Sequence, residues 1–408
     1  MNKNIKLLGL LLAITGSAFS ITLCSIGLTV YVIGFLLETT LDKGVFHPYY
    51  PGGRFLIPLL ISLLISLFIS HYFKVSLRGL FKFIEGFILL YAAVDVIRTP
   101  KELRIVIFTL GSVFFFAALA GICQDVFGRD FVYFRRAIDT ESDLPKRITG
   151  ALKHYNDYGS FLAPGFPVIL ALFLKKAGHR EMRGAVFFAL LFAMLCYAMF
   201  RTLSRSAILA VFTSLLFFGI FFRHRWITIG ILAALVLAVW IIPSPLGVRF
   251  KSIANASTPE RLALIKITLS MIKAKPLFGL GLNTYSDYFP QFRPANYHAA
   301  MYAHNSYLQI AAEAGLVGLF CYLSMILALV WGTVKAFLSN RSADDGLLTM
   351  GFVSAVIAMM TNALFESLLQ STQLRTLFWC FLGIATALTV NFIRPQIRFL
   401  HPQVKVSS

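Results

Sequence analysis

The sequence predicts an all-α integral membrane protein with about 12 transmembrane helices, forming one membrane domain over residues 1–408. Composition is the first observation. Of the 408 residues, 58% are hydrophobic and 13% are charged, whereas soluble domains carry roughly 25% charged residues. The second observation is that apolar runs long enough to cross about 30 Å of hydrocarbon recur along the whole chain. These runs are continuous rather than alternating, which excludes a membrane β-barrel.

The apolar runs give the expected spans in order. Residues 7–37 are too long for one helix, so we expect two helices, broken near Gly16-Ser17 or at Ser20. The run at 305–336 is also long, and its first turns are expected to lie outside the hydrocarbon. The other spans are expected at about 54–71, 80–97, 104–122, 157–174, 185–200, 204–222, 225–243, 347–366 and 374–393.

Basic residues in the short links predict the orientation of these spans. Most of these links are rich in lysine and arginine, which is typical of cytoplasmic loops. Both termini then also face the cytoplasm, and two long loops, 123–156 and 244–304, face outside. The link that carries Lys74, Arg78 and Lys82 contradicts this pattern. Either an amphipathic surface helix there or an error in the count of the first two spans would explain it.

Charge and cysteine usage argue against several other classes of protein. The formal net charge of +19 suggests a nucleic-acid partner at first sight. However, the basic residues lie mostly in short loops between apolar runs, so membrane topology accounts for them and no nucleic acid is expected. The five cysteines lie in or beside apolar segments without CxxC spacing, so neither disulfides nor a metal site is expected.

The external loop 244–304 is basic and contains a predicted amphipathic helix. It carries seven basic and two acidic residues. Thr258 is suited to cap the helix and Pro259 to occupy its first position. The helix either lies on anionic lipid headgroups or serves an anionic substrate. Its expected apolar stripe consists of Leu262, Ile265, Leu269 and Ile272. Beyond the helix, Gly279 and Gly281 indicate a turn rather than a nucleotide-binding loop.

Two arginines stand in the very short link between the spans at 185–200 and 204–222. Arg201 and Arg205 are expected at the external boundary, with Arg205 entering the top of the second span. An arginine in hydrocarbon usually faces a protein interior or a polar cavity, and its fork of donors grips phosphate well. The alternative is that both side chains extend to the external headgroups.

His304 stands where the external loop meets the apolar run at 305–336. A single histidine at a helix start is either a structural hydrogen-bonding residue or a general base, since histidine titrates near neutral pH. Glu313 lies nine residues on, roughly across the helix, and is expected to be structural. Several other polar residues are expected on the external side, where they can line the same cavity: Arg147, His154, Asn156, Asp157, Glu366, Gln370 and Arg375.

Four segments together resemble the O-antigen ligase family, which also contains O-antigen polymerases and protein O-oligosaccharyltransferases. His304 and Gly315 fit the family's spacing of His, ten residues, Gly, and Arg205 and Leu209 fit its spacing of Arg, three residues, Leu. The resemblance covers roughly residues 75–390. The four segments are Arg147-Ile148-Thr149-Gly150 with Asn156, Thr202 to Ala207, Pro259 to Gly281, and Ala303 to Gly315.

The resemblance implies a ligase-type glycosyltransferase of the bacterial inner membrane. The donor would be a glycan on undecaprenyl pyrophosphate at the periplasmic face, and the acceptor a sugar hydroxyl of lipid A–core. No cofactor or metal is expected, because pyrophosphate is already a good leaving group. On the matching motifs, His304 would be the base of an inverting displacement, and Arg205 and Arg261 would stabilise the pyrophosphate. The expected substrate-binding residues are Arg201, Arg147, Asn156, Asn305 and Tyr307.

Other readings remain open at this point. Within the family, a polymerase would extend the glycan on its lipid carrier, and a protein ligase would transfer it to serine or threonine. The motifs do not separate these. A small-anion transporter is less favoured, because the candidate residues gather at one face and the chain shows no internal repeat. A structural partner in a cell-wall assembly complex would need neither Arg205 nor His304.

Overall fold

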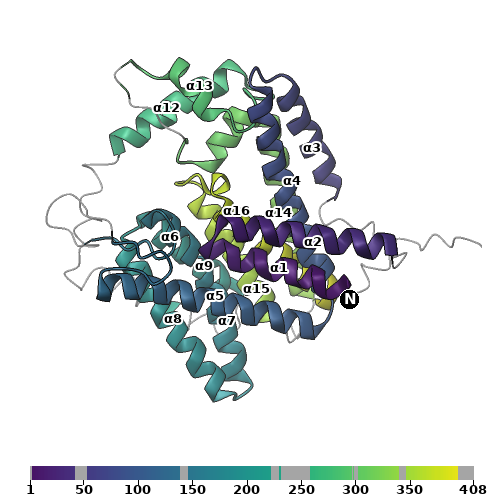
Figure 1. Ribbon diagram of the computed structural model, residues 1–408, viewed down its shortest axis with the longest axis vertical. Helices are drawn as coiled ribbons and strands as arrows, with labels where there is room; N and C mark the ends of the chain where they lie inside the picture. Colours follow the sequence, from purple (N-terminus) through teal and green to yellow (C-terminus); the bar gives the residue numbers. More distant parts are fainter. Residues whose placement is uncertain are drawn as a thin grey trace, which may run out of the picture.

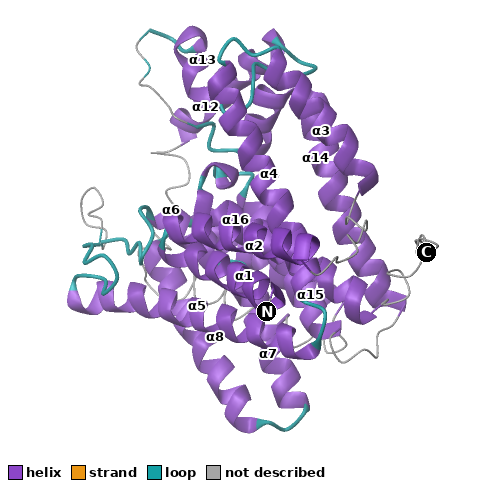
Figure 2. Ribbon diagram, turned by 45° about the vertical axis from the view of Figure 1, so that its right-hand side comes forward, coloured by secondary structure: helices purple, strands orange, loops and turns teal. Residues whose placement is uncertain are grey.

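The computed structural model describes residues 2–41, 53–137, 146–221, 229–230, 258–295, 297, 302–339 and 346–393. Within these ranges the regular elements are helices and no β-strand occurs, which confirms the all-α prediction (Figure 1, Figure 2). In chain order they are α1 (Asn2–Phe19), α2 (Ile21–Leu41), α3 (Gly53–Phe68), α4 (Phe73–Val96), α5 (Pro100–Phe127), α6 (Tyr155–Leu162), α7 (Gly165–Gly178), α8 (Met182–Thr202), α9 (Arg205–Phe221), α12 (Thr258–Ala274), α13 (Tyr285–Phe292), α14 (Ser306–Ser339), α15 (Gly346–Asn362), η1 (Leu368–Gln370), α16 (Thr372–Leu388) and η2 (Thr389–Ile393).

Six helical segments in the described ranges are long and apolar enough to cross a membrane, and three shorter helices are also apolar. The count of about 12 spans therefore stays a prediction. The span expected at 225–243 lies outside the described residues except for 229–230. The segment expected as one helix at 157–174 is two, α6 and α7. Lys74, Arg78 and Lys82 all lie in α4, so this basic stretch forms no separate surface helix.

The first two helices form a close antiparallel pair, and the chain breaks between them at Ser20, one of the two positions predicted. Small residues allow this approach, as they do in other membrane helix pairs. A methyl group on Gly16 would lie 2.4 Å from the backbone nitrogen of Cys24, and one on Gly27 would lie 2.3 Å from that of Ala13. This pair packs against α4, α5 and α16.

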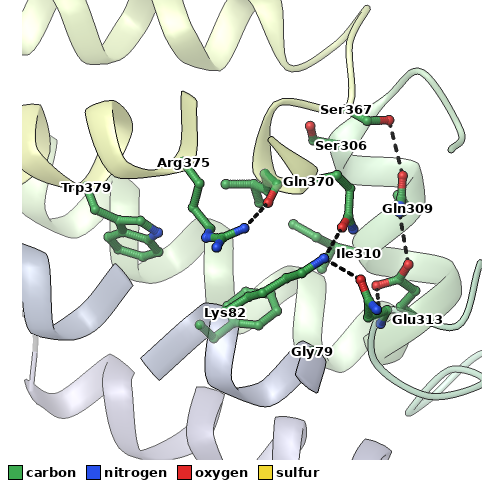
Figure 3. Close-up of a pocket in the computed structure, with 13 residues that line it drawn as sticks. Gly79, Lys82, Ser306, Gln309, Ile310, Glu313, Ser367, Gln370, Arg375 and Trp379 are labelled. Atoms are coloured by element: carbon green, nitrogen blue, oxygen red, sulfur yellow. Dashed lines mark hydrogen bonds between the residues drawn. The ribbon is translucent and has the colours of Figure 1, made fainter. Parts of the chain in front are cut away.

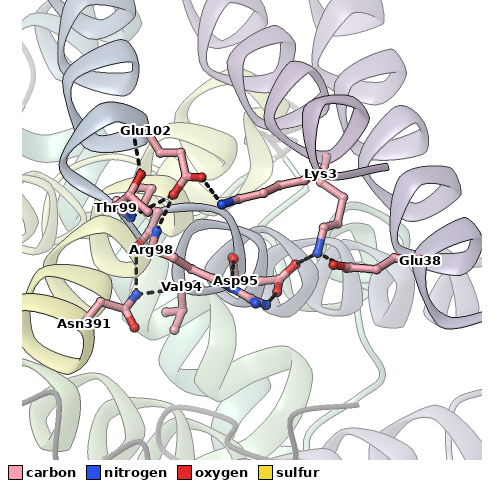
Figure 4. Close-up of polar contacts among 10 residues, drawn as sticks. Lys3, Glu38, Val94, Asp95, Arg98, Thr99, Glu102 and Asn391 are labelled. Atoms are coloured by element: carbon pink, nitrogen blue, oxygen red, sulfur yellow. Dashed lines mark hydrogen bonds and ion pairs between the residues drawn. The ribbon is translucent and has the colours of Figure 1, made fainter. Parts of the chain in front are cut away.

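A buried charge network ties the N-terminal pair to α4 and α5 (Figure 4). Lys6, with 1% of its surface exposed, donates to a carboxylate oxygen of Asp95 over 2.7 Å. Glu38 and Arg98 form ion pairs with these two residues. Because buried charges are tolerated only when they are paired, the network fixes how these helices meet.

The centre of the protein is α16, which is buried along nearly its whole length. It packs against α1, α4, α14 and α15, and α15 also contacts α7 and α9. The contact with α4 depends on Gly86, where a methyl group would lie 2.1 Å from the indole nitrogen of Trp379. This packing holds the N-terminal end of α16 and the loop before it in place for the candidate site.

The chain after residue 258 forms a small second core, in which α12 and α13 pack on the first part of α14 (Figure 1). A helix is confirmed there, and it is described from Thr258 onwards, so the cap expected at Thr258 stays a prediction. The predicted apolar stripe is wrong in part, because Leu262 and Leu269 are 52% and 42% exposed. The helix is rotated so that a neighbouring face packs inward, and its buried side chains are Leu264, Ile267, Met271 and Ile272.

A backbone clasp joins this small core to α14. The helix is interrupted at Gly315, which has a φ of 74° and a ψ of 177°. The turn that follows α12 lies against the interruption, and Leu280 and Gly281 donate their N–H groups to the carbonyls of Ala312 and Glu313 over 2.9 and 3.0 Å. Gly279 and Gly281 have φ values of 72° and 125°, so the prediction of a turn is confirmed.

Candidate functional site

The short helix α6 contacts two of the segments that form the candidate site. Ser160 accepts a hydrogen bond from Nδ2 of Asn362, at the end of α15, over 2.7 Å. Gly159 faces the start of α9, where a methyl group would lie 2.8 Å from the Cβ of Ala207. Asn156 donates through Nδ2 to Oε1 of Glu366 over 2.9 Å. The helix therefore brings the beginning of α9 and the loop after α15 to one place.

Glu366 is the centre of the polar cluster. Its side chain is only 8% exposed. Besides Asn156, it has two neighbours far away in the sequence. Nη2 of Arg261 lies 3.4 Å from Oε1, and Nδ1 of His304 lies 3.4 Å from Oε2. A buried carboxylate of this kind needs cations and donors around it, and here the candidate catalytic residues supply them.

The pairing of His304 with Glu366 determines which ring nitrogen is available for chemistry. When Nδ1–H donates to the carboxylate, Nε2 carries the lone pair that accepts a proton. The histidine side chain is 49% exposed, so the ring is accessible from outside the protein. The arrangement is that of a general base oriented by an acid, as in other acid–histidine pairs.

The backbone holds His304 in this position. Its φ of 48° is unusual for a residue other than glycine, and such strain persists only where surrounding contacts enforce it. Ser306 donates its N–H to the carbonyl of Ala363 and its hydroxyl to the carbonyl of Glu366, both over 2.8 Å. The first turn of α14 is therefore bound directly to the loop that carries the acid.

Arg261 reaches the cluster from α12, whereas Arg205 is placed only on α9, which packs against α6. Arg261 lies in the first turns of α12, which packs on α14, and its side chain is 40% exposed. Arg205 begins α9, next to the contact between Gly159 and Ala207, and it is partly buried. The structure thus brings Arg261, His304 and Asn156 together around Glu366 and places Arg205 on the helix that packs against α6.

Arg201 has another partner. Its Nε donates to Oδ2 of Asp125 over 2.7 Å, and Nη2 contacts the other carboxylate oxygen, so the pair is bidentate. Tyr197 donates its hydroxyl to the same acid. This pairing was not predicted, because α5 continues to Phe127, five residues past its predicted end, and so carries Asp125 in its last turn. The geometry gives Arg201 the role of joining α8 to α5.

Arg147 is buried, and its guanidinium has few hydrogen-bond partners among the described residues. It is 3% exposed, and its Nε and Nη2 have no hydrogen-bond partner in the described part of the chain. Its guanidinium carbon lies 4.0 Å from the ring centroid of Tyr155. The residues that follow Arg147 are held to α5, because Oε1 of Gln124 accepts the N–H groups of Thr149 and Gly150 over 2.7 and 3.0 Å.

The two remaining predicted site residues support the fold of α14. Oδ1 of Asn305 accepts the N–H groups of Tyr307 and Leu308 at 3.0 Å, which caps the helix. The hydroxyl of Tyr307 donates to the carbonyl of Met360 over 2.7 Å. Their side-chain contacts thus explain their presence without a substrate.

A separate pocket lies behind the first turns of α14 (Figure 3). Lys82 reaches across it from α4 and donates to Oε1 of Gln370 over 2.8 Å and to Asn283. Glu313 is buried there and accepts from Nε2 of Gln309 over 2.9 Å, as expected for a structural residue. Gln370 and Arg375, expected beside His304, line this pocket instead. The contribution of Lys82 was not predicted, although a lysine within an apolar helix is itself a signal.

His154 closes the site on the side of α6. Its Nδ1 accepts the N–H of Asn156 over 3.1 Å and so caps the helix. Burial lowers the pKa of His154, an effect that the nearby charge of Glu366 opposes. The imidazole is therefore neutral near neutral pH, as its role as an acceptor requires.

Comparison with known proteins agrees with this geometry. Residues 188–323 match the family model described as O-Antigen ligase. The matched stretch contains Arg205, Arg261 and His304, whereas Glu366 and Asn156 lie outside it. No curated protein matches the chain. This match agrees with the resemblance of the four motif segments to the O-antigen ligase family.

Proposed function

We propose that the protein transfers a glycan from undecaprenyl pyrophosphate to a sugar hydroxyl of lipid A–core at the periplasmic face of the inner membrane. The family match over residues 188–323 supports this, because members of that family are glycosyltransferase-like enzymes. The observation that carries the proposal is the pair formed by His304 and Glu366, with the guanidinium of Arg261 on the same carboxylate. It combines a proton acceptor with a cation that suits a phosphate leaving group.

In the proposed reaction the acceptor hydroxyl attacks the anomeric carbon of the donor sugar. Nε2 of His304 takes the hydroxyl proton while the new glycosidic bond forms. The bond from the anomeric carbon to the pyrophosphate oxygen breaks on the opposite side, so the configuration inverts. Undecaprenyl pyrophosphate leaves with the bonding electron pair, and Glu366 stabilises the imidazolium that remains.

The arginines would act on the leaving group. Negative charge grows on the pyrophosphate as the glycosidic bond breaks, and guanidinium groups of Arg205 and Arg261 stabilise that charge. The contact between Arg261 and Glu366 is long, at 3.4 Å, and the arginine side chain is partly exposed. It therefore keeps donors available for a phosphate while still attached to the cluster.

One reconstitution experiment tests the substrate assignment. The purified protein, in lipid nanodiscs, receives a defined undecaprenyl-pyrophosphate glycan and one of three acceptors: lipid A–core, additional lipid-linked glycan, or a serine- and threonine-containing peptide. Transfer to lipid A–core alone supports the ligase. Consumption of a different acceptor would instead identify a polymerase or a protein ligase.

A labelling experiment tests the orientation. Lys266 is exposed on α12, so a Lys266→Cys variant on a background without other cysteines accepts a membrane-impermeant maleimide. Labelling from the periplasmic side of intact cells is expected. Labelling only after the cytoplasm is opened would place the site on the wrong side for this donor.

A further inference from the structure

Arg147 is a buried cation without a counter-charge in the described structure. It is 3% exposed, two of its three guanidinium nitrogens have no hydrogen-bond partner, and no ion pair of Arg147 occurs among the described residues. Its close contact is the face of Tyr155, at 4.0 Å. Removing a guanidinium from water is costly, and a stacked ring compensates for only a small part of that cost.

The position of Arg147 relates it to the candidate site. Tyr155 stacks on it and is followed by Asn156, which donates to Glu366. Tyr155 also lies within electrostatic range of both Glu366 and Arg261. On the other flank, Ile148 donates its N–H to the carbonyl of Arg201 over 3.3 Å, just before the start of α9. Tyr155 is therefore in contact with Arg147 and lies near the cluster around Glu366.

We propose that Arg147, which has no counter-charge among the described residues, is an anion-binding residue that binds a phosphate group when the donor is present. The inference rests on the proposed function for the source of that phosphate, which is the pyrophosphate of the lipid carrier. Tyr155 is partly exposed and its ring lies against the guanidinium. A phosphate that binds Arg147 would displace this ring.

This arrangement differs from that of Arg201, which satisfies its guanidinium within the protein. Asp125 takes two of its nitrogens, so Arg201 requires no ligand. Arg147 has the same side chain and also lies near the end of α8, but its Nε and Nη2 have no hydrogen-bond partner among the described residues. The two arginines can therefore be compared directly. Arg201 is neutralised by Asp125, whereas Arg147 has no anionic partner among the described residues.

The test measures thermal unfolding of the full-length protein in nanodiscs, with and without inorganic pyrophosphate. Because Arg147→Met removes an uncompensated buried charge, the variant is expected to unfold at the same temperature as wild type or higher without ligand. Its affinity for pyrophosphate is expected to fall about tenfold or more. Arg147→Lys keeps the charge but loses the fork of donors, and it is expected to weaken pyrophosphate binding while leaving the fold intact.

Arg201→Met is the control, and it should behave in the opposite way. It leaves Asp125 without its partner, so the unfolding temperature should fall while pyrophosphate affinity stays at the wild-type value. If Arg147→Met lowers the unfolding temperature and retains full affinity, Arg147 is structural and the inference is wrong. If Arg147→Lys binds pyrophosphate as wild type does, the inference is also wrong.

The same measurements separate this inference from the proposed function. Pyrophosphate binding needs neither acceptor nor turnover, so it can be lost in the Arg147 variants even if no transfer to lipid A–core is found. In that case only the proposed function fails. Adding undecaprenyl pyrophosphate or an anionic phospholipid in place of pyrophosphate identifies the source of the phosphate. Protection by the phospholipid alone would overturn the assignment to the donor.

Discussion

Nδ1 of His304 lies 3.4 Å from Oε2 of Glu366, although the two residues are 62 positions apart in the chain. The contact joins the first turn of α14 to the loop after α15, and two further hydrogen bonds of Ser306 hold the same two segments together. The backbone thus brings the proposed base, His304, and the carboxylate that would orient it together without a ligand.

Replacing either member of this pair should reduce glycan transfer. His304→Ala removes the proton acceptor, and a loss of about 10²-fold to 10⁴-fold in kcat is expected. Glu366→Gln keeps the shape but loses the charge that orients and stabilises the imidazolium, so kcat should fall about 10²-fold or more with little change in KM. His71→Ala, at an exposed position, is the control. Wild-type kcat in both site variants would refute the assignment.

Glycan transfer should decrease even when Arg261 is replaced by another basic residue. Arg261→Lys replaces a planar fork by a single ammonium group, and we expect kcat/KM to fall by about tenfold to 10²-fold. Arg261→Ala should lower it by about 10²-fold to 10³-fold, as for other groups that stabilise growing charge. Lys266→Ala, on an exposed part of the same helix, should leave transfer unchanged. Equal effects at Lys266 would mean that the helix contributes only general positive charge.

The ion pair of Arg201 and Asp125 should contribute to stability rather than to transfer. Arg201→Ala leaves a mostly buried carboxylate unpaired, so it should lower the unfolding temperature. The double variant with Asp125→Ala should regain part of this loss and keep wild-type transfer. A double variant that is stable but inactive would show that Arg201 contacts the donor after all, as its place beside Arg205 in the sequence suggested.

Stability should fall in mild acid through His154. Burial lowers its pKa below the ordinary value of 6.5, so the folded protein favours the neutral ring. The stabilisation is therefore present above pH 6.5 and is lost as the pH falls below that value toward the folded pKa, because the unfolded chain then binds a proton more readily. His154→Asn keeps a capping acceptor that does not titrate. Its unfolding temperature should drop less than that of wild type between pH 7.5 and 5.5, and an equal drop would contradict this account.

Any side chain at Gly315, where α14 is interrupted, should destabilise the protein. A methyl group on Gly315 would lie 2.1 Å from the carbonyl oxygen of Leu277, and the φ of 74° adds strain. Gly315→Ala should therefore destabilise the protein by at least about 2 kcal/mol. Gly332, farther along the same helix, has nothing within 4 Å of its added methyl group, so Gly332→Ala should be neutral or stabilising by up to about 1 kcal/mol. Similar unfolding temperatures for the two variants would argue against the clasp.

Local patterns in the sequence were sufficient for part of this structure. The break at Ser20 and the turn at Gly279 both follow from rules about neighbouring residues. The partner of Arg201 does not, because Asp125 lies 76 positions away and the two meet only when α5 and α8 pack. Glu366 was expected merely on the same side as His304, and its central place in the cluster depends on tertiary packing of α6, α12 and α14. The buried face of α12 likewise depends on what the helix packs against, since the apolar residues on its two sides are similar.

The backbone clasp at Gly315 has a consequence for how the site keeps its alignment. The turn after α12 and the first segment of α14 are joined by main-chain hydrogen bonds, so the helix that carries Arg261 and the helix that follows His304 behave as one piece. Main-chain hydrogen bonds therefore set the position of the turn after α12 relative to the first segment of α14, and they do not depend on which side chains surround them. If the proposed transfer is correct, different glycans would meet the same arrangement of the proposed base, His304, and the proposed pyrophosphate ligand, Arg261.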